Sequence, residues 1–126
     1  IQEVKMDLIY KSTRNNQETA TASEAILKGL AGEGGLFVPS YIPKLDKSLK
    51  ELSAMSYQEV AYEVMKLFMT DFTEEELKHC INSAYDKKFD TESIAELVKK
   101  EDAYYLELFH GATLHLKIWH FPSFHI

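Results

Sequence analysis

A helical pattern of apolar residues in the middle of the chain constrains the fold more than any other feature. Apolar side chains recur there at spacings of three and four, at Val60, Ala61, Val64, Leu67 and Phe68. This spacing predicts a helix that begins near Ser53 or Ser56 and buries one face. A core built on this helix needs further elements to cover that face.

Two more helices are predicted after the first. Thr73 precedes Glu76 by three residues, which is the capping-box pattern of a helix start. Its apolar face is Leu77, Cys80, Ile81, Ala84 and Tyr85. A short helix over Thr91–Lys100 would bury Ile94, Leu97 and Val98, with two lysines at its negative end. The segment from Ser56 to Lys100 is therefore expected to form about three helices.

Short strands and one more helix are predicted around this helical region. Leu8–Thr13 alternates weakly and is expected to form an edge strand. Thr21 is placed to cap a helix with Ala25, Ile26, Leu27 and Leu30 on one face, which ends in a glycine-rich stretch over 32–35. Those glycines lack the spacing of a phosphate-binding loop, so a turn is expected. Leu36–Val38 and Tyr104–Phe109 are predicted strands, giving an α+β fragment that is mostly helical with a few short strands.

Composition narrows the class of protein. A chain of 126 residues is one domain or a piece of one. Its net charge of −6 argues against a nucleic-acid partner, and no apolar run approaches the roughly 20 residues that span a membrane. The single cysteine, Cys80, excludes an internal disulfide and fits a reducing cytoplasm, where we expect the protein to reside.

The candidate chemistry lies after the last predicted strand. There the chain runs through His110, Gly111 and Thr113 to a single lysine, Lys117. A lysine just past a strand-to-turn junction can anchor an aldehyde cofactor through its amine, and a nearby glycine lets the backbone approach a ligand closely. A solvated surface lysine is the alternative interpretation of this segment taken alone.

Several blocks of the sequence resemble one enzyme family in order and spacing. Residues 106–117, L-E-L-F-H-G-A-T-L-H-L-K, are similar to the threonine synthase motif L-E-L-F-H-G-P-T-x-A-F-K-D. Residues 10–14, Y-K-S-T-R, resemble its opening Y-x-S-T-R, and residues 23–39 resemble its S-E-A-L-x-x-G-L-A-x-D-G-G-L-Y-V-P block. Residues 42–45, I-P-K-L, and 56–61, S-Y-Q-E-V-A, match two further blocks. The resemblance covers Tyr10 to Leu114.

The resemblance implies a pyridoxal-phosphate enzyme of fold type II, an α/β parent that converts O-phospho-L-homoserine and water to L-threonine and phosphate. It implies that Lys117 is the catalytic and cofactor-binding lysine, and that His110, Gly111 and Thr113 shape the entrance to it. Arg14 is implied on the substrate side or in a structural role. Two alternatives remain: a paralogue acting on another phosphorylated hydroxy-amino acid, and a non-catalytic helical interaction module.

The two ends of the chain depart from the family pattern. Residues 1–5 precede Met6, where a native start would fall, and are expected to be upstream or cloning-derived. Residues 6–114 form the expected threonine synthase N-terminal domain. Residues 115–126 are not family-like, yet insertion of one base after the Leu114 codon permits the reading L-A-F-K-D-M-A-L-S, so we expect a frame-shifted tail. A fragment that stops here should be inactive alone, and its exposed interface should favour self-association.

No metal site is predicted from the histidines of the C-terminal segment. His110, His115, His120 and His125 fall at intervals of five. A shared helical face needs spacings of three or four, and a shared strand face needs even spacings. The pattern therefore indicates no common set of ligands.

Overall fold

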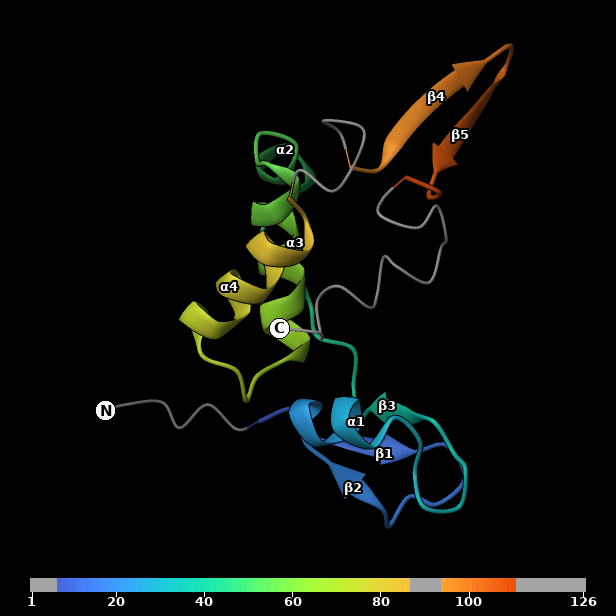
Figure 1. Cartoon of the computed structure of the whole chain (residues 1–126), viewed down its shortest axis with the longest axis vertical. Helices are drawn as coiled ribbons and strands as arrows, with labels where there is room; N and C mark the ends of the chain where they lie inside the picture. The colour runs from blue at the N-terminus through green and yellow to red at the C-terminus, as the bar shows by residue number, and fades with distance from the viewer. Residues whose placement is uncertain (1–6, 87–93, 111–126) are drawn as a thin grey trace.

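The computed structural model describes residues 7–86 and 94–110, and these form three parts along the longest axis of the molecule (Figure 1). A small sheet with helix α1 lies at one end, helices α2, α3 and α4 lie in the middle, and a β-hairpin projects from the other end. The described part thus has four helices and two antiparallel sheets, which confirms the predicted α+β class. None of its helices is long and apolar enough to cross a membrane.

The N-terminal sheet has the strand order β2-β1-β3, with β1 Tyr10–Ser12, β2 Thr19–Ala20 and β3 Phe37–Pro39. A strand therefore forms within the predicted segment 8–13, but β1 pairs antiparallel with both neighbours, so the prediction that it lies at the edge was wrong. The reason is that the chain returns past the glycine-rich turn and lays β3 along the second side of β1. Helix α1, Ala22–Lys28, follows β2 directly.

Every described helix begins with a capping box, in which a hydroxyl and a glutamate three residues later bond each other's backbone amides. The pairs are Thr21 with Glu24, Ser48 with Glu51, Ser56 with Glu59, and Thr73 with Glu76. Ser56 rather than Ser53 therefore opens α3, Tyr57–Phe68, and Thr73 opens α4, Glu74–Ala84, as predicted. The short helix α2, Leu49–Leu52, was not predicted.

The main core lies between α3, α4 and the start of the hairpin. Its buried members are Leu77, Ile81, Ala84, Tyr85 and Ile94. The predicted apolar face of α4 is confirmed except at Cys80, which is only partly buried. On α3 the residues that pack here are Tyr57, Ala61, Tyr62 and Met65, whereas Val64 of the predicted stripe is 40% exposed. The rings of Tyr57 and Tyr85 meet edge to face in this core, with 5.0 Å between their centroids.

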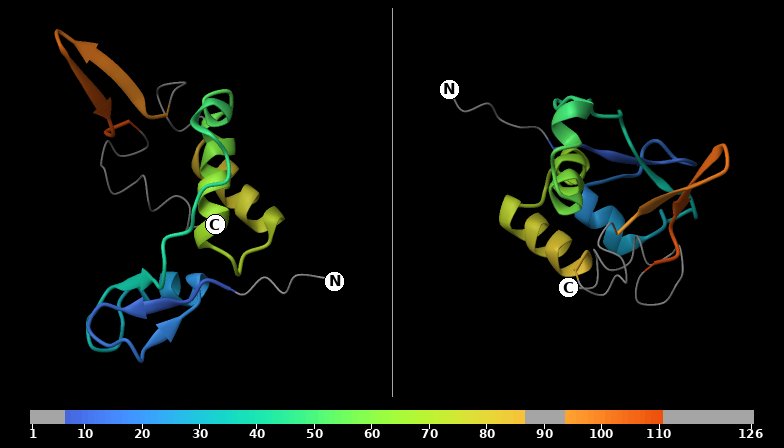
Figure 2. Two further views of the ribbon diagram at one scale, coloured as in Figure 1. Left: turned by 180° about the vertical axis from the view of Figure 1, so that it is seen from behind. Right: turned by 90° about the horizontal axis from the view of Figure 1, so that it is seen from above.

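The prediction of a helix over residues 91–100 is wrong for residues 94–100, the part that the structure describes. Glu96–Lys100 is strand β4, which pairs antiparallel with β5, Ala103–Glu107, across a two-residue turn at Glu101 and Asp102 (Figure 2). Leu97, expected in the core, is 59% exposed. Pairing with a strand several residues further along supplies ladder hydrogen bonds that outweigh a weak helical pattern in so short a segment.

The link between α3 and α4 joins the helices to the N-terminal sheet. The Leu8 amide donates to Thr70 Oγ1 at 2.8 Å, and the Tyr10 hydroxyl donates to the carbonyl of Phe68 at 3.0 Å. Burial, followed by the nearby Asp71 carboxylate, raises the pKa of Tyr10, so its hydroxyl stays a donor. This joint fixes the sheet against the helical pair.

Candidate functional site at the end of strand β5

The register of the hairpin brings two carboxylates together. Glu96 at the start of β4 lies directly opposite Glu107 at the end of β5, and both side chains are partly buried. Directly opposed residues of an antiparallel pair project from the same face of the sheet. Two like charges in this position repel each other, and a cation or a hydrogen-bond donor beside them would stabilise the pair.

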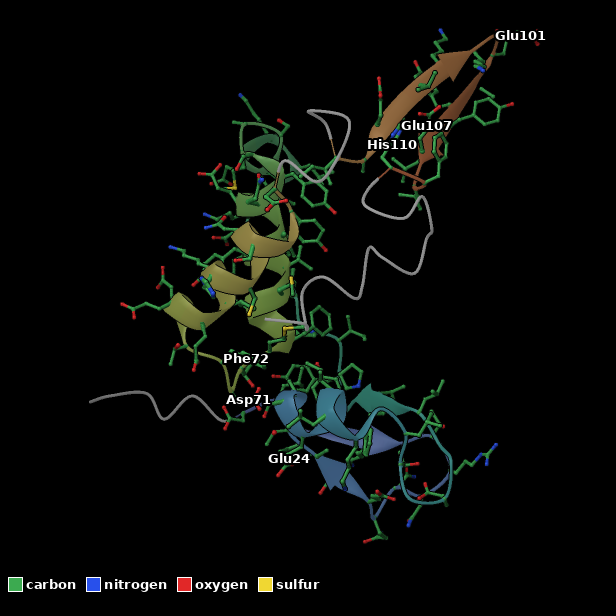
Figure 3. All side chains as sticks on the ribbon, in the orientation of Figure 1. Glu24, Asp71, Phe72, Glu101, Glu107 and His110 are labelled. Carbon is green, nitrogen blue, oxygen red and sulfur yellow. The ribbon has the colours of Figure 1, made fainter. Side chains whose placement is uncertain are left out.

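His110 supplies that group. Its Nε2 lies 2.8 Å from Glu107 Oε2, and its side chain is only 11% exposed (Figure 3). The Phe109 ring packs on the imidazole with 4.6 Å between centroids. Ligand atoms of Glu96, Glu107 and His110 all lie within 4.8 Å of one another. The end of β5 is therefore a polar cluster in which the position of His110 is fixed.

Only part of the predicted site can be placed. His110 lies in the cluster just described, whereas Gly111, Thr113 and Lys117 fall outside the described residues. Glu107 is not among the residues predicted for the site, and the structure pairs it with His110. The sequence signal that could have found this pair is the spacing of three between Glu107 and His110, just past a strand end.

Arg14 does not join this cluster. It follows β1, at the end of the molecule opposite to β5 (Figure 1). Its Nη1 donates to the carbonyl of Glu33 at 3.0 Å, and its amide donates to Ser12 Oγ at 3.1 Å. These contacts tie the first loop to the glycine-rich turn, and the role of Arg14, structural or on the substrate side, stays a prediction.

The amides of the glycine-rich turn donate hydrogen bonds to acceptors within the protein. The Gly32 amide donates to both carboxylate oxygens of Glu18, at 3.0 and 3.1 Å, and the Gly34 amide donates to the carbonyl of Ala31 at 2.8 Å. The Ser12 hydroxyl donates to the Glu33 carboxylate, and this bond is the main cause that lowers the pKa of Glu33. The amides of Gly32 and Gly34 therefore point to protein acceptors rather than to a phosphate.

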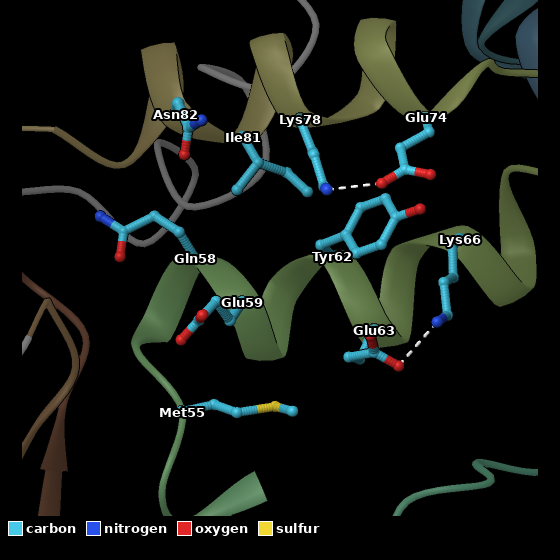
Figure 4. Close-up of a pocket in the computed structure, with 10 residues that line it drawn as sticks. All are labelled: Met55, Gln58, Glu59, Tyr62, Glu63, Lys66, Glu74, Lys78, Ile81 and Asn82. Atoms are coloured by element: carbon cyan, nitrogen blue, oxygen red, sulfur yellow. Dashed lines mark hydrogen bonds and ion pairs between the residues drawn. The ribbon is translucent and has the colours of Figure 1, made fainter.

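A groove on α3 and α4 carries paired charges (Figure 4). Lys66 bonds Glu63 at 2.7 Å, and Lys78 bonds Glu74 one turn away. Both ammonium groups also lie over the Tyr62 ring, at 5.3 and 4.9 Å from its centroid. Each lysine is thus engaged on the protein surface, and the groove has the character of a solvated ion-pair face.

Comparison with known proteins places this architecture in one class, the threonine synthases. The family described as "Threonine synthase N terminus" matches residues 9–85. Threonine synthase of Saccharomyces cerevisiae is 35% identical over 119 residues, covering 86% of this chain and 23% of the yeast protein. The chain therefore belongs to the threonine synthase family and corresponds to its N-terminal region.

Solved structures agree with this assignment. The crystal structure of yeast threonine synthase superposes with a TM-score of 0.78 at 33% identity, over 89% of this chain and 24% of that one. The structure of threonine synthase from Brucella melitensis, solved with pyridoxal phosphate bound, superposes with a TM-score of 0.77 at 32% identity, over 89% and 25%. The chain spans about a quarter of the length of these relatives.

Proposed function

We propose that this chain is the N-terminal region of a threonine synthase, which converts O-phospho-L-homoserine and water to L-threonine and phosphate. The family match over residues 9–85 carries the proposal. It is supported by the L-E-L-F-H motif at residues 106–110, which the structure describes up to His110. Lys117 follows His110 by seven residues in the sequence. Within that enzyme the fragment holds the start of the lysine-bearing segment.

The described residues do not complete a site for pyridoxal phosphate. When bound, this cofactor supplies an electron sink for carbanion chemistry on an amino acid. Lys117, which would anchor its aldehyde by position, lies outside the described residues, and the glycine turn at 32–35 is already bonded to protein acceptors. We therefore derive no catalytic step from this fragment and propose that it is inactive alone.

Among the described residues, His110 is the one to which we assign a positioning role in that enzyme. Glu107 orients the imidazole, Phe109 packs on it, and burial keeps it from rotating into solvent. A fixed residue at this point gives the following segment, through Gly111 and Thr113 to Lys117, a defined starting position. This is the positioning that a catalytic amine needs in the complete enzyme.

Phosphate release tests the proposal directly. The purified 126-residue chain, with pyridoxal phosphate and O-phospho-L-homoserine, should release no phosphate above a protein-free blank, while the yeast enzyme in the same assay does. Borohydride reduction followed by peptide mapping should label Lys117 no more than the other lysines of the chain. Turnover, or selective labelling of Lys117, would show that the fragment holds a working site. Turnover of another phosphorylated hydroxy-amino acid would instead support the paralogue.

Exposed apolar side chains favour a second property, self-association through the hairpin. Leu97, Tyr104, Tyr105 and Leu106 are each more than half exposed, as is Phe109 just after the hairpin. Unpaired strand edges with such side chains associate readily. Light scattering after size-exclusion chromatography should show dimers or larger species that Tyr105→Lys and Leu106→Lys reduce. A monomer at all concentrations would argue against self-association. The cytoplasmic location stays a prediction.

A further inference from the structure

We propose that Glu96, Glu107 and His110 form a binding site for a divalent transition metal of the zinc type. The inference goes beyond the proposed function and does not depend on it, because it concerns binding by the chain as it stands. It rests on the juxtaposition of one imidazole and two carboxylates at the base of the hairpin, where Figure 3 labels His110 and Glu107.

The backbone, rather than flexible side chains alone, brings these groups together. The ladder pairs Glu96 with Glu107, so neither carboxylate can leave the shared face without breaking the register. His110 follows three residues after Glu107 and is buried. Such restraint lowers the ordering entropy lost when an ion binds. The ligands also come from two strands, so a bound ion would bridge the ends of the hairpin.

The distances suit a metal ion after small side-chain movements. Ligand atoms from the three residues lie within 4.8 Å of one another. Zinc binds imidazole nitrogen and carboxylate oxygen at about 2.0–2.2 Å, so in a four-coordinate site its ligand atoms lie about 3.3–3.6 Å apart. The widest separation in the cluster would therefore have to close by about 1–1.5 Å, which rotation about the side-chain bonds allows.

The donor set selects the class of ion. A histidine nitrogen disfavours magnesium and calcium, which prefer sites made of oxygen ligands. One imidazole with two carboxylates suits zinc and its neighbours, and three protein ligands leave a fourth position for water. A bound divalent ion would also offset the repulsion between the two facing glutamates, because it carries more positive charge than the His110 imidazole can.

Strain at the start of β4 supports a functional arrangement at this end of the hairpin. Ile94 is buried at 5% exposure yet has a φ of 54°, a conformation that β-branched residues rarely adopt. It lies two residues before Glu96 and packs into the core beside Leu77 and Ile81. The buried side chain thus anchors the strand that carries Glu96, and such strain often accompanies binding sites.

Zinc titration against a chromophoric chelator tests the site. The tail histidines His115, His120 and His125 would add ligands, so the titration uses the full chain with these three replaced by alanine. We expect one zinc ion per chain, with affinity reduced at least about tenfold by Glu96→Gln or Glu107→Gln. Glu101→Gln, at the tip of the same hairpin, is the matched control and should leave the affinity unchanged.

Two results would overturn the site. One is no zinc bound at 100-fold excess; the other is equal affinity in all the variants. A readout on the unsubstituted chain guards against variants that fail to fold. Addition of zinc should shift the His110 ring signals in a nuclear magnetic resonance spectrum, and unshifted signals would exclude His110 as a ligand. Neither result bears on the phosphate-release assay, so the two proposals fail separately.

Discussion

Asp71 Oδ2 accepts two hydrogen bonds from Ser23, one from the backbone amide at 3.0 Å and one from the hydroxyl at 2.6 Å. The contact joins the link between α3 and α4 to the first turn of α1, and Figure 3 shows Asp71 at the junction of the two parts. Together with the bonds from Leu8 and Tyr10, it attaches the N-terminal sheet to the helices.

Removal of the Asp71 carboxylate should loosen this joint. Asp71→Ala should lower the free energy of unfolding by about 1.5–3 kcal/mol, the usual range for hydrogen bonds to a charged group. Urea denaturation followed by circular dichroism measures the change. Asp7→Ala removes an exposed carboxylate of the same type and should have little effect. Equal stabilities of the two variants would mean that the joint contributes nothing.

Stability should fall as the pH is lowered below about 5. The cap hydroxyls and amides of Ser48, Ser56 and Thr73 lower the pKa of Glu51, Glu59 and Glu76 from the ordinary 4.5. For Asp71, burial acts to raise the pKa, but the hydrogen bonds from Ser23 outweigh it, and the pKa falls below 3.8.

A carboxylate whose pKa is lower in the folded state stabilises the fold above its unfolded pKa and loses this contribution as the pH drops through the folded value. The urea midpoint should therefore decline between pH 5 and pH 3, and less steeply in Glu76→Gln than in Glu75→Gln. Glu75 shares the first turn of α4 but is not the glutamate of its capping box. A midpoint that stays constant or rises would contradict this expectation.

The glycine-rich turn should tolerate a side chain at one glycine and not at another. A Cβ at Gly35 would clash with Ser12 Oγ and lie 3.2 Å from the Arg14 amide nitrogen, so atoms in the turn must move. Gly35→Ala should destabilise the protein by about 1–3 kcal/mol, as overpacking does elsewhere. At Gly32 the nearest atom is a Glu18 oxygen at 3.5 Å, an ordinary contact. Thermal unfolding of Gly32→Ala should match the parent chain, and equal losses in both variants would refute the steric cause.

Local signals in the sequence were enough to predict helix starts, because a capping box is made within four residues. Thr73 with Glu76 was identified in this way, and Ser56 was one of two candidates for α3. The second strand of the hairpin was predicted, over Tyr104–Phe109, but β4 was not, because β4 is stabilised by pairing with β5. Short apolar runs with lysines satisfy both helical and strand patterns, and only the partner strand decides between them.

The candidate site likewise combines a residue that the sequence predicts with contacts that only the fold creates. His110 was identified through the family motif, but its contact with Glu107 and the approach of Glu96 depend on the hairpin register. The expectation of no shared metal site followed from the spacing of four histidines, of which the structure describes only His110. Glu96 approaches His110 through the pairing of β4 with β5, which could not be foreseen because the segment around Glu96 was expected to be helical.

A chimaeric enzyme tests most directly whether this chain is a functional threonine synthase N-terminal region. Residues 7–110 would replace the corresponding region of the yeast enzyme, which supplies the lysine and the rest of the cofactor domain. The chimaera should release phosphate from O-phospho-L-homoserine no more than about tenfold slower than the yeast enzyme, a loss of ~1.4 kcal/mol in transition-state stabilisation. A soluble chimaera that binds pyridoxal phosphate but releases none would contradict the assignment.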